Sequence, residues 1–248
     1  MKKLFIPFLL VLFIVNTSCN RSKSNSNDID VETYFISDSV LIDNGYEEDY
    51  SRYTMNIDLP VTKNDTLRQN IIQWMLSSDN DDYQAYFKAD EKRFFDEEGH
   101  EPRSVFEGKY TLKEQTDLYV TYISDGYSYT GGAHPMPWYY GTSFSKIDGS
   151  IVGYDMFDDP EQLAPMITEN IRKQHFEFFD MEEDMIELAP EDFLQLPTNE
   201  PWIEADSVVF CYEPYEIAPY VAGMPLCKIS KEDLQPYLSE KGKSLLNN

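Results

Sequence analysis

A glycine-rich segment around His134 has the residue types needed to bind a ligand or to move a proton. Gly131 and Gly132 adopt positive φ without steric cost, so the chain can turn sharply and leave the imidazole at the edge of a loop. Aromatic faces and tyrosine hydroxyls suit sugars and protein surfaces. Such residues flank the loop on both sides: Tyr127, Tyr129, Trp138, Tyr139 and Tyr140. We expect Tyr129, Gly131, Gly132, His134 and Trp138 to contact a ligand. The favoured alternative is a structural histidine that hydrogen-bonds neighbouring backbone, because a glycine-rich turn needs no ligand.

A second segment, residues 212–223, contains further candidate contacts. It is punctuated by Pro214, Pro219 and Gly223 and lies between two expected strands, so we expect an ordered connection. Tyr215 and Tyr220 are candidate ligand-binding residues, and packing into the core is the alternative for both.

Cys211 and Cys227 lie on the two expected strands that flank this connection. If these strands pair antiparallel, the sulfur atoms can face each other and close the loop. A disulfide across a loop of this size would stabilise the fold by ~3 kcal/mol. We predict this bond, and the alternative is two separate buried thiols.

The residues needed for catalysis are not grouped in any recognisable pattern. The chain has no Gly-x-Ser-x-Gly segment, and His100, His134 and His175 fall on different expected elements. No His-x-x-x-His pair is present for zinc. We therefore predict no catalytic residue, no metal site and no cofactor. An envelope glycan hydrolase or deacetylase that uses His134 with a neighbouring acid remains the alternative.

Alternating strand patterns and helical periods predict the elements that position these residues. Strands are expected at residues 31–36, 53–59, 118–123, 138–144, 208–212 and 226–229, with a hairpin turn at 148–149. Helices are expected after Asn64, from residue 83 towards Gly99, after Asp159 and after Ser230. Hairpins interrupted by helices predict an α+β fold of antiparallel sheets with packed helices.

The first nineteen residues predict export and a lipid anchor. Lys2 and Lys3 precede an uncharged stretch of twelve residues, 4–15, which is too short to span a bilayer and has the length of a signal-peptide core. Small and polar residues then lead to Cys19, which resembles a bacterial lipoprotein signal with a lipidated cysteine. Residues 1–18 are the expected signal peptide and 19–29 a flexible tether. The alternative is ordinary secretion with Cys19 as a free thiol.

The charge of the chain restricts its partners. The 248 residues include 45 acidic and 20 basic side chains, a formal net charge of −25. Removal of residues 1–18 would take away two lysines and leave 18 basic residues, a net of −27. Such a chain does not suit nucleic acid, whose phosphates require clustered Lys and Arg. The charge would attract a basic protein.

Two segments carry a resemblance to a known family. Residues 127–135 read Tyr-Ser-Tyr-Thr-Gly-Gly-Ala-His-Pro, and residues 212–223 contain Tyr-Glu-Ile-Ala-Pro-Tyr. Together they resemble the extracytoplasmic tandem of RsiV-type lysozyme-sensing anti-sigma factors, which also accompanies PdaC-type peptidoglycan deacetylases. The strand at 57–60 and the helix at 67–76 are similar to the first module of that tandem. The resemblance covers roughly residues 30 to 240.

The resemblance implies two intimately associated modules, at residues 30–135 and 136–245, and binding to a lysozyme-like protein or to peptidoglycan glycan. Anti-sigma factors also need a spanning helix and a cytoplasmic segment, and the deacetylases carry a separate hydrolase domain; we expect neither here. We therefore expect a non-catalytic cell-envelope lipoprotein that faces the periplasm or the cell surface. A structural component of a surface complex is a further alternative.

Overall fold

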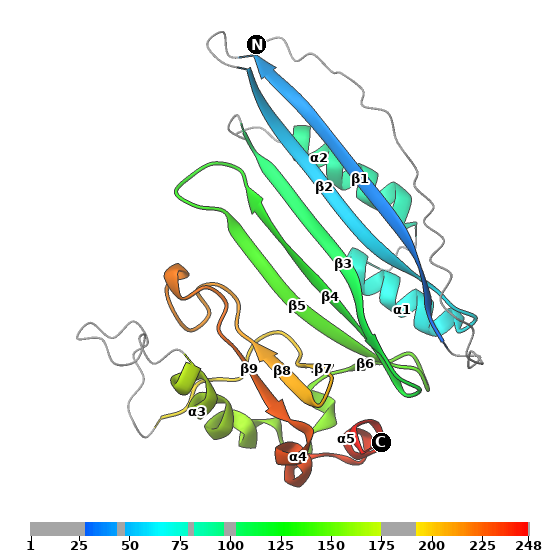
Figure 1. Cartoon of the computed structure of the whole chain (residues 1–248), viewed down its shortest axis with the longest axis vertical. Coiled ribbons are helices and arrows are strands. Elements are labelled where there is room, and N and C mark those ends of the chain that lie inside the picture. Colours follow the sequence, from blue (N-terminus) through cyan, green and yellow to red (C-terminus); the bar gives the residue numbers. More distant parts are fainter. Residues whose placement is uncertain (1–27, 44–47, 79–81, 97–102, 175–191, 248) are drawn as a thin grey trace. The chain divides into compact units, whose positions relative to one another are not determined.

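The computed structural model describes residues 28–43, 48–78, 82–96, 103–174 and 192–247 (Figure 1). The described residues form two compact units. The first contains the described residues up to Leu112 together with Ser124–Pro137, and the second contains Lys113–Ile123 together with the described residues from Trp138 onward. The predicted module boundary between residues 135 and 136 stays a prediction. Within the described ranges, no helix has the length and apolarity required to cross a membrane.

The larger sheet has six strands whose spatial order follows the sequence. β1 and β2 pair antiparallel along their whole length, whereas β2 and β3 pair parallel because helices α1 and α2 connect them. The bounds of these elements are β1 Asp30–Asp43, β2 Glu48–Val61, α1 Asp65–Leu76, α2 Tyr83–Asp96, β3 Val105–Gln115, β4 Tyr119–Tyr129, β5 Met136–Ser145 and β6 Ile151–Val152. The predicted α+β class is confirmed, and the parallel pair makes this sheet mixed.

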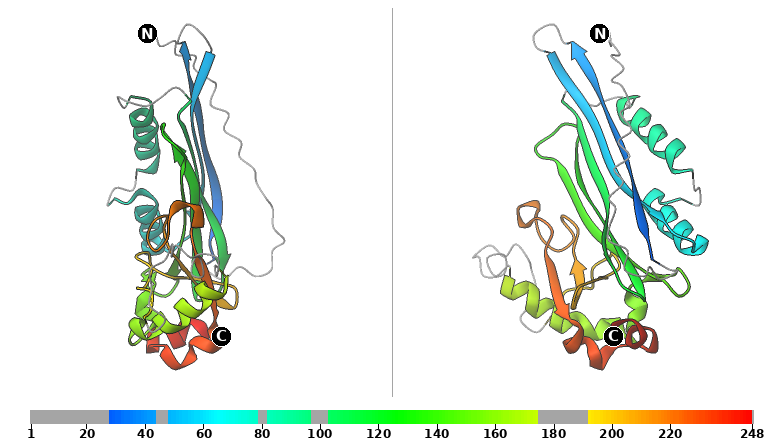
Figure 2. Two further views of the ribbon diagram at one scale, coloured as in Figure 1. Left: turned by 90° about the vertical axis from the view of Figure 1, so that its left-hand side faces the viewer. Right: turned by 45° about the vertical axis from the view of Figure 1, so that its right-hand side comes forward.

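In the first unit, α1 and α2 cover one face of the sheet (Figure 2). Asn64 caps α1 by accepting a hydrogen bond from Leu67 N at 3.1 Å, as its sequence pattern predicts. Tyr53 of β2 is fully buried, and its ring stacks on Phe106 with 4.8 Å between centroids. Its hydroxyl donates to Asp90 of α2 at 2.8 Å. Phe87 and Phe94 of α2 are buried in the core of this unit, and the Phe94 ring lies 5.8 Å from that of Tyr53.

The second unit contains a three-stranded antiparallel sheet in the order β7-β8-β9. Its elements are β7 Trp202–Glu204, β8 Ser207–Cys211, β9 Leu226–Ser230, α3 Ala164–Gln174, α4 Lys231–Leu234 and α5 Glu240–Leu246. The predicted start of a helix after Asp159 is a 3-10 turn, Pro160–Leu163, that leads directly into α3. Ser230 caps α4 through Asp233 N, as predicted. Strand β7 and helix α5 were not predicted.

A close approach in the second unit requires glycine at position 141. A Cβ atom there would lie 2.5 Å from the indole of Trp202 and 2.7 Å from Ile123 Cδ1. Beside it, the buried hydroxyls of Thr121 and Ser143 bind the backbone of Ile203: Thr121 donates to Ile203 O at 2.9 Å, and Ser143 Oγ accepts from Ile203 N at 2.9 Å. The backbone of β7 is thus held against β4 and β5 within this unit.

Candidate ligand-binding site

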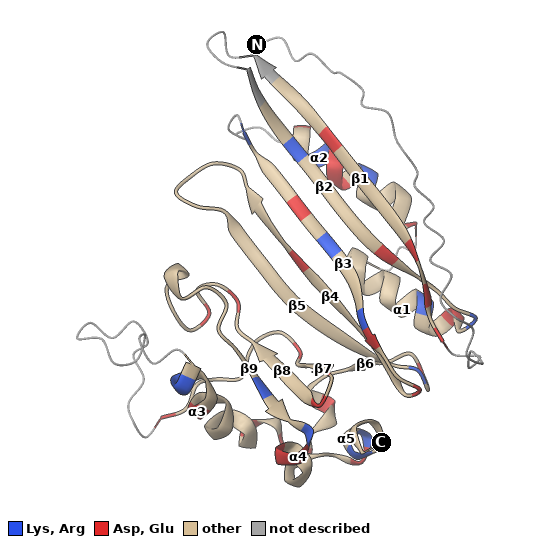
Figure 3. Ribbon diagram, in the orientation of Figure 1, with Lys and Arg blue, Asp and Glu red and all other residues tan. Residues whose placement is uncertain are grey.

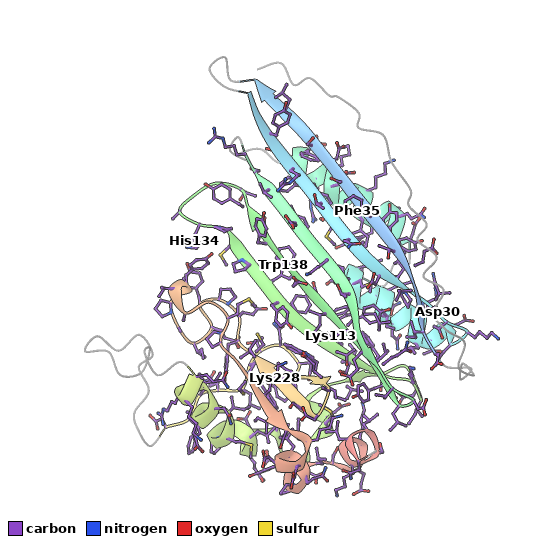
Figure 4. All side chains as sticks on the ribbon, viewed as in Figure 1. Asp30, Phe35, Lys113, His134, Trp138 and Lys228 are labelled. Carbon is purple, nitrogen blue, oxygen red and sulfur yellow. The ribbon has the colours of Figure 1, made fainter. Side chains whose placement is uncertain are left out.

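The β4–β5 loop has the sharp turn that its glycines predict. Gly131 and Gly132 have φ values of 113° and 94°, which side chains other than glycine rarely adopt. The Tyr129 hydroxyl donates to Gly132 O at 3.1 Å and so ties the end of β4 to the turn. His134 Nδ1 lies 3.1 Å from Pro135 O, and because a carbonyl oxygen only accepts, Nδ1 carries the proton in this contact. The position of His134 in the loop is marked in Figure 4.

The aromatic residues at the start of β5 divide between the two faces of the strand. The Tyr139 ring packs edge-on against Trp202 with 5.8 Å between centroids, and its carbonyl accepts a hydrogen bond from the Cys211 thiol at 3.6 Å. Tyr139 is therefore part of the core of the second unit. Because side chains alternate along a strand, Trp138 and Tyr140 lie on the opposite face, where both are half-buried.

The connection between β8 and β9 is held by the carboxylate of Glu216. Glu216 Oε1 accepts hydrogen bonds from Thr198 N at 2.7 Å and Thr198 Oγ1 at 2.8 Å, and Oε2 accepts from Glu213 N at 2.7 Å. A reciprocal bond runs from Glu216 N to Glu213 O. Glu216 was not among the predicted site residues. Its only signal in the sequence is its position three residues after Glu213, which is the spacing of a capping box.

This ordered connection presents two tyrosine side chains. Tyr215 has φ 70° and is 54% exposed. Val221, which follows Tyr220 in the chain, is 69% exposed. The ring centroids of Tyr215 and Tyr220 lie 5.9 Å apart with a tilt of 36°. Tyr212, in contrast, is buried and donates to Gln195 O at 2.7 Å. Of the tyrosines in residues 212–223, Tyr212 thus packs in the core and Tyr215 lies on the surface.

The structure does not support the predicted disulfide. Cys211 and Cys227 are both free and buried. In the β8–β9 register Cys227 pairs with Phe210 and Cys211 pairs with Leu226, so the two cysteines occupy opposite faces of the sheet. Cys227 packs in the main core of the unit and Cys211 in the smaller cluster around Trp202. The prediction was wrong because the pairing is shifted by one residue.

Two lysines and a glutamate form a charged cluster at the three-stranded sheet (Figures 3 and 4). Lys228 Nζ lies 2.7 Å and Lys113 Nζ lies 3.6 Å from Glu204 Oε1. Burial alone would raise the pKa of Glu204, but the hydrogen bond and charge of Lys228, together with the charge of Lys113, outweigh it and lower the pKa. The carboxylate is therefore ionised at neutral pH and is shared by the two lysines.

Among the described residues, no group of three or more His, Cys, Asp or Glu side chains is arranged to hold a metal ion. His100, His175 and Cys19 lie outside the described residues. The candidate contacts fall into two groups. Tyr129, Gly131, Gly132 and His134 belong to the first unit, and Trp138, Tyr215 and Tyr220 belong to the second. Tyr215 is the one aromatic side chain among these candidates that is exposed, whereas Tyr129, His134, Trp138 and Tyr220 are half-buried.

The fold and these segments define a two-module α+β protein with an ordered aromatic connection in its second module. Residues 46–137 match the family model for deacetylase PdaC, and residues 154–232 match the model for the DUF3298 family, a protein family of unknown function. The resemblance predicted from the two motifs is confirmed by these matches. No curated protein matches the chain.

Two solved structures share this fold. A DUF3298 family member from Bacteroides fragilis NCTC 9343 has a TM-score of 0.67 at 16% identity, over 90% of this chain and 98% of its own. A DUF3298 family protein from Pseudomonas aeruginosa PAO1 has a TM-score of 0.59 at 18% identity, over 87% of this chain and 97% of its own. The comparison extends over both modules and concerns the fold alone.

Proposed function

We propose that this protein is a cell-envelope lipoprotein, anchored through Cys19, that binds a basic lysozyme-like protein without catalysing a reaction. The exposed Tyr215 ring, which lies against the half-buried Tyr220 on the Glu216-bound connection, carries the proposal. Tyrosine supplies large contact area with few rotatable bonds, so a tyrosine fixed on an ordered loop loses little conformational entropy on binding. Exposed aromatic side chains held in this way are typical of binding sites.

The charge of the chain supports a basic partner. The formal net charge of −25 creates a negative potential that increases the rate of encounter with a cationic protein. Lysozyme binding is also what the resemblance to the sensing anti-sigma factors implies. Because the attraction is electrostatic, it weakens as the ionic strength rises and the Debye length shortens.

Peptidoglycan glycan is the second candidate ligand. The Tyr215 ring is exposed and can stack on the apolar face of a sugar, and the first matching family model takes its name from a deacetylase. The hydrolytic alternative is less well supported. His134 Nδ1 donates to Pro135 O of its own loop, a contact that suits a structural histidine.

The substitution Tyr215→Ala tests the binding site. We expect it to weaken binding of a basic lysozyme to the purified mature lipoprotein about tenfold or more, because truncation of an aromatic anchor removes well over 1 kcal/mol. Titration calorimetry at low and moderate salt measures this change. The midpoint of thermal unfolding should stay the same, because more than half of the side chain is already exposed.

Tyr50→Ala provides a matched control. Tyr50 lies on β2 in the first unit and is 54% exposed, the same as Tyr215, so its loss should leave lysozyme affinity unchanged. Equal affinities of the wild-type protein and Tyr215→Ala would contradict the proposed site. A wild-type protein that retains neither lysozyme nor peptidoglycan fragments at any ionic strength would contradict the proposed function as a whole.

A further inference from the structure

Strand β1 is an edge strand of unusual length. It has fourteen residues, and β2 is its only neighbour among the described strands (Figures 1 and 2). In an antiparallel pair, every second residue directs its N–H and C=O groups away from its partner. About half of the backbone groups of β1 therefore face outward over a length of roughly 48 Å. Such an edge is a template for one more strand.

Three of the four acidic residues of β1 lie on one face of the strand. Asp30, Glu32 and Asp38 occupy even positions and therefore share the face that carries buried Ile36 and Val40. Tyr34 on the same face packs edge-on against Tyr83 of α2 with 5.5 Å between ring centroids, so this is the face covered by the helices. Burial and the charge of Asp38 raise the pKa of Glu91 in α2, whereas Lys88 opposes this shift. Lys92 and Arg93 of α2 form ion pairs with Asp96 and Asp90. The acids of β1 and Glu91 outnumber Lys88 on this side of the edge, so the local charge is negative.

The opposite face of β1 is uncharged over residues 31–37. Val31 is 40% exposed and Phe35 is 53% exposed, with Thr33 and Ser37 beside them. In Figure 4, Asp30 and Phe35 mark one residue of each set. A strand added to this edge would therefore place alternate side chains beside acids on one face and beside apolar groups on the other.

We propose that β1 binds an extended polypeptide segment in which basic and apolar residues alternate, as an additional strand of the sheet. The basic side chains lie on the helix side next to Asp30, Glu32 and Asp38, and the apolar side chains lie next to Val31 and Phe35. A second copy of this chain is a poor occupant, because β1 has four acidic residues and no Lys or Arg, so like charges would face each other across the pair.

A synthetic ten-residue peptide of alternating Lys and Val is the probe, tested with the purified mature lipoprotein. We expect binding to slow amide hydrogen exchange in residues 30–41, because outward N–H groups become hydrogen-bonded. The double variant Glu32→Lys, Asp38→Lys should weaken binding at least tenfold. The matched control Glu161→Lys, Glu232→Lys changes the net charge equally through exposed residues of the second unit and should retain most of the affinity.

Two N-methylated peptides separate strand pairing from simple charge attraction. One has N-methyl groups on every Lys and the other on every Val, so each blocks one hydrogen-bonding edge and keeps the charge. At least one of them should bind tenfold or more weakly than the parent peptide. Equal affinity of all three peptides, or unchanged exchange in β1, would overturn the proposal. Tyr215→Ala should not affect this binding, so the outcome is independent of the lysozyme site.

Discussion

At the scale of single residues, the candidate site depends on Glu216. One carboxylate accepts two backbone N–H groups and one hydroxyl, which holds the connection in a conformation that includes Tyr215 at positive φ. A tyrosine in this region of φ is energetically unfavourable by itself and needs surrounding contacts to fix it. The three hydrogen bonds of the carboxylate supply such contacts on either side of Tyr215.

Glu216→Ala should therefore lower both stability and affinity. We expect the free energy of unfolding to fall by about 1–3 kcal/mol, since two backbone donors lose their acceptor. Lysozyme binding should weaken because the tyrosine pair is no longer held in place. Glu213→Ala is the matched control, because the side chain of Glu213 accepts a hydrogen bond from the side chain of Asn199, at 2.8 Å, rather than from the backbone of the connection. Urea unfolding and calorimetry measure the two effects; equal losses in both variants would contradict the role of Glu216.

At the scale of elements, the register of β8 and β9 determines the state of the cysteines. A shift of one residue moves a side chain to the other face of a sheet. Cys211 lies opposite Leu226 and Cys227 opposite Phe210, so neither sulfur faces the other. Burial raises the pKa of each thiol to about 12, so neither is ionised near neutral pH.

A thiol titration tests this register. We expect two reactive thiols in the denatured Cys19→Ser variant without any reductant, and almost none in the native protein at pH 8, because the reactive thiolate form is suppressed. A colourimetric thiol reagent measures both. The absence of titratable thiols in the denatured chain would show that Cys211 and Cys227 are bonded and that the register is different.

At the scale of the whole molecule, four tyrosine hydroxyls and two cysteine thiols have raised pKa values and therefore stay protonated in the native state. Burial is the largest cause of the raised pKa of Tyr53, Tyr119, Tyr154 and Tyr212, and the two thiols behave in the same way. In the unfolded chain these groups have ordinary pKa values near 9 and 10. Above pH 9 the unfolded state therefore binds fewer protons than the native state, and stability falls as the pH rises.

We expect the urea midpoint to be steady between pH 7 and 8.5 and to decrease from about pH 9 upward. Each thiol contributes on the order of 1 kcal/mol per pH unit between its unfolded and its native pKa. The double variant Cys211→Ala, Cys227→Ala should show a shallower decrease, although it starts from a lower stability because of the cavities. A midpoint independent of pH up to 11 in the wild-type protein would contradict the burial of these groups.

The sequence by itself determined the features that depend on neighbouring residues. The Asn64 and Ser230 caps, the period of α1 and the turn at Gly131–Gly132 follow from local geometry, and the structure has each of them. The two family motifs could also be recognised in the sequence, because each is a continuous segment. A family model matches the part of the chain that contains each motif.

Only the tertiary structure decided which residues meet and which face the solvent. The parallel β2–β3 pair, the one-residue register of the cysteines and the short strand β7 depend on partners far away in the sequence, and periodicity carries no signal for them. The same holds for Tyr212 and Tyr215. They are three residues apart and of one type, yet one is buried and the other exposed, because the Glu216 carboxylate fixes the path of the chain between them.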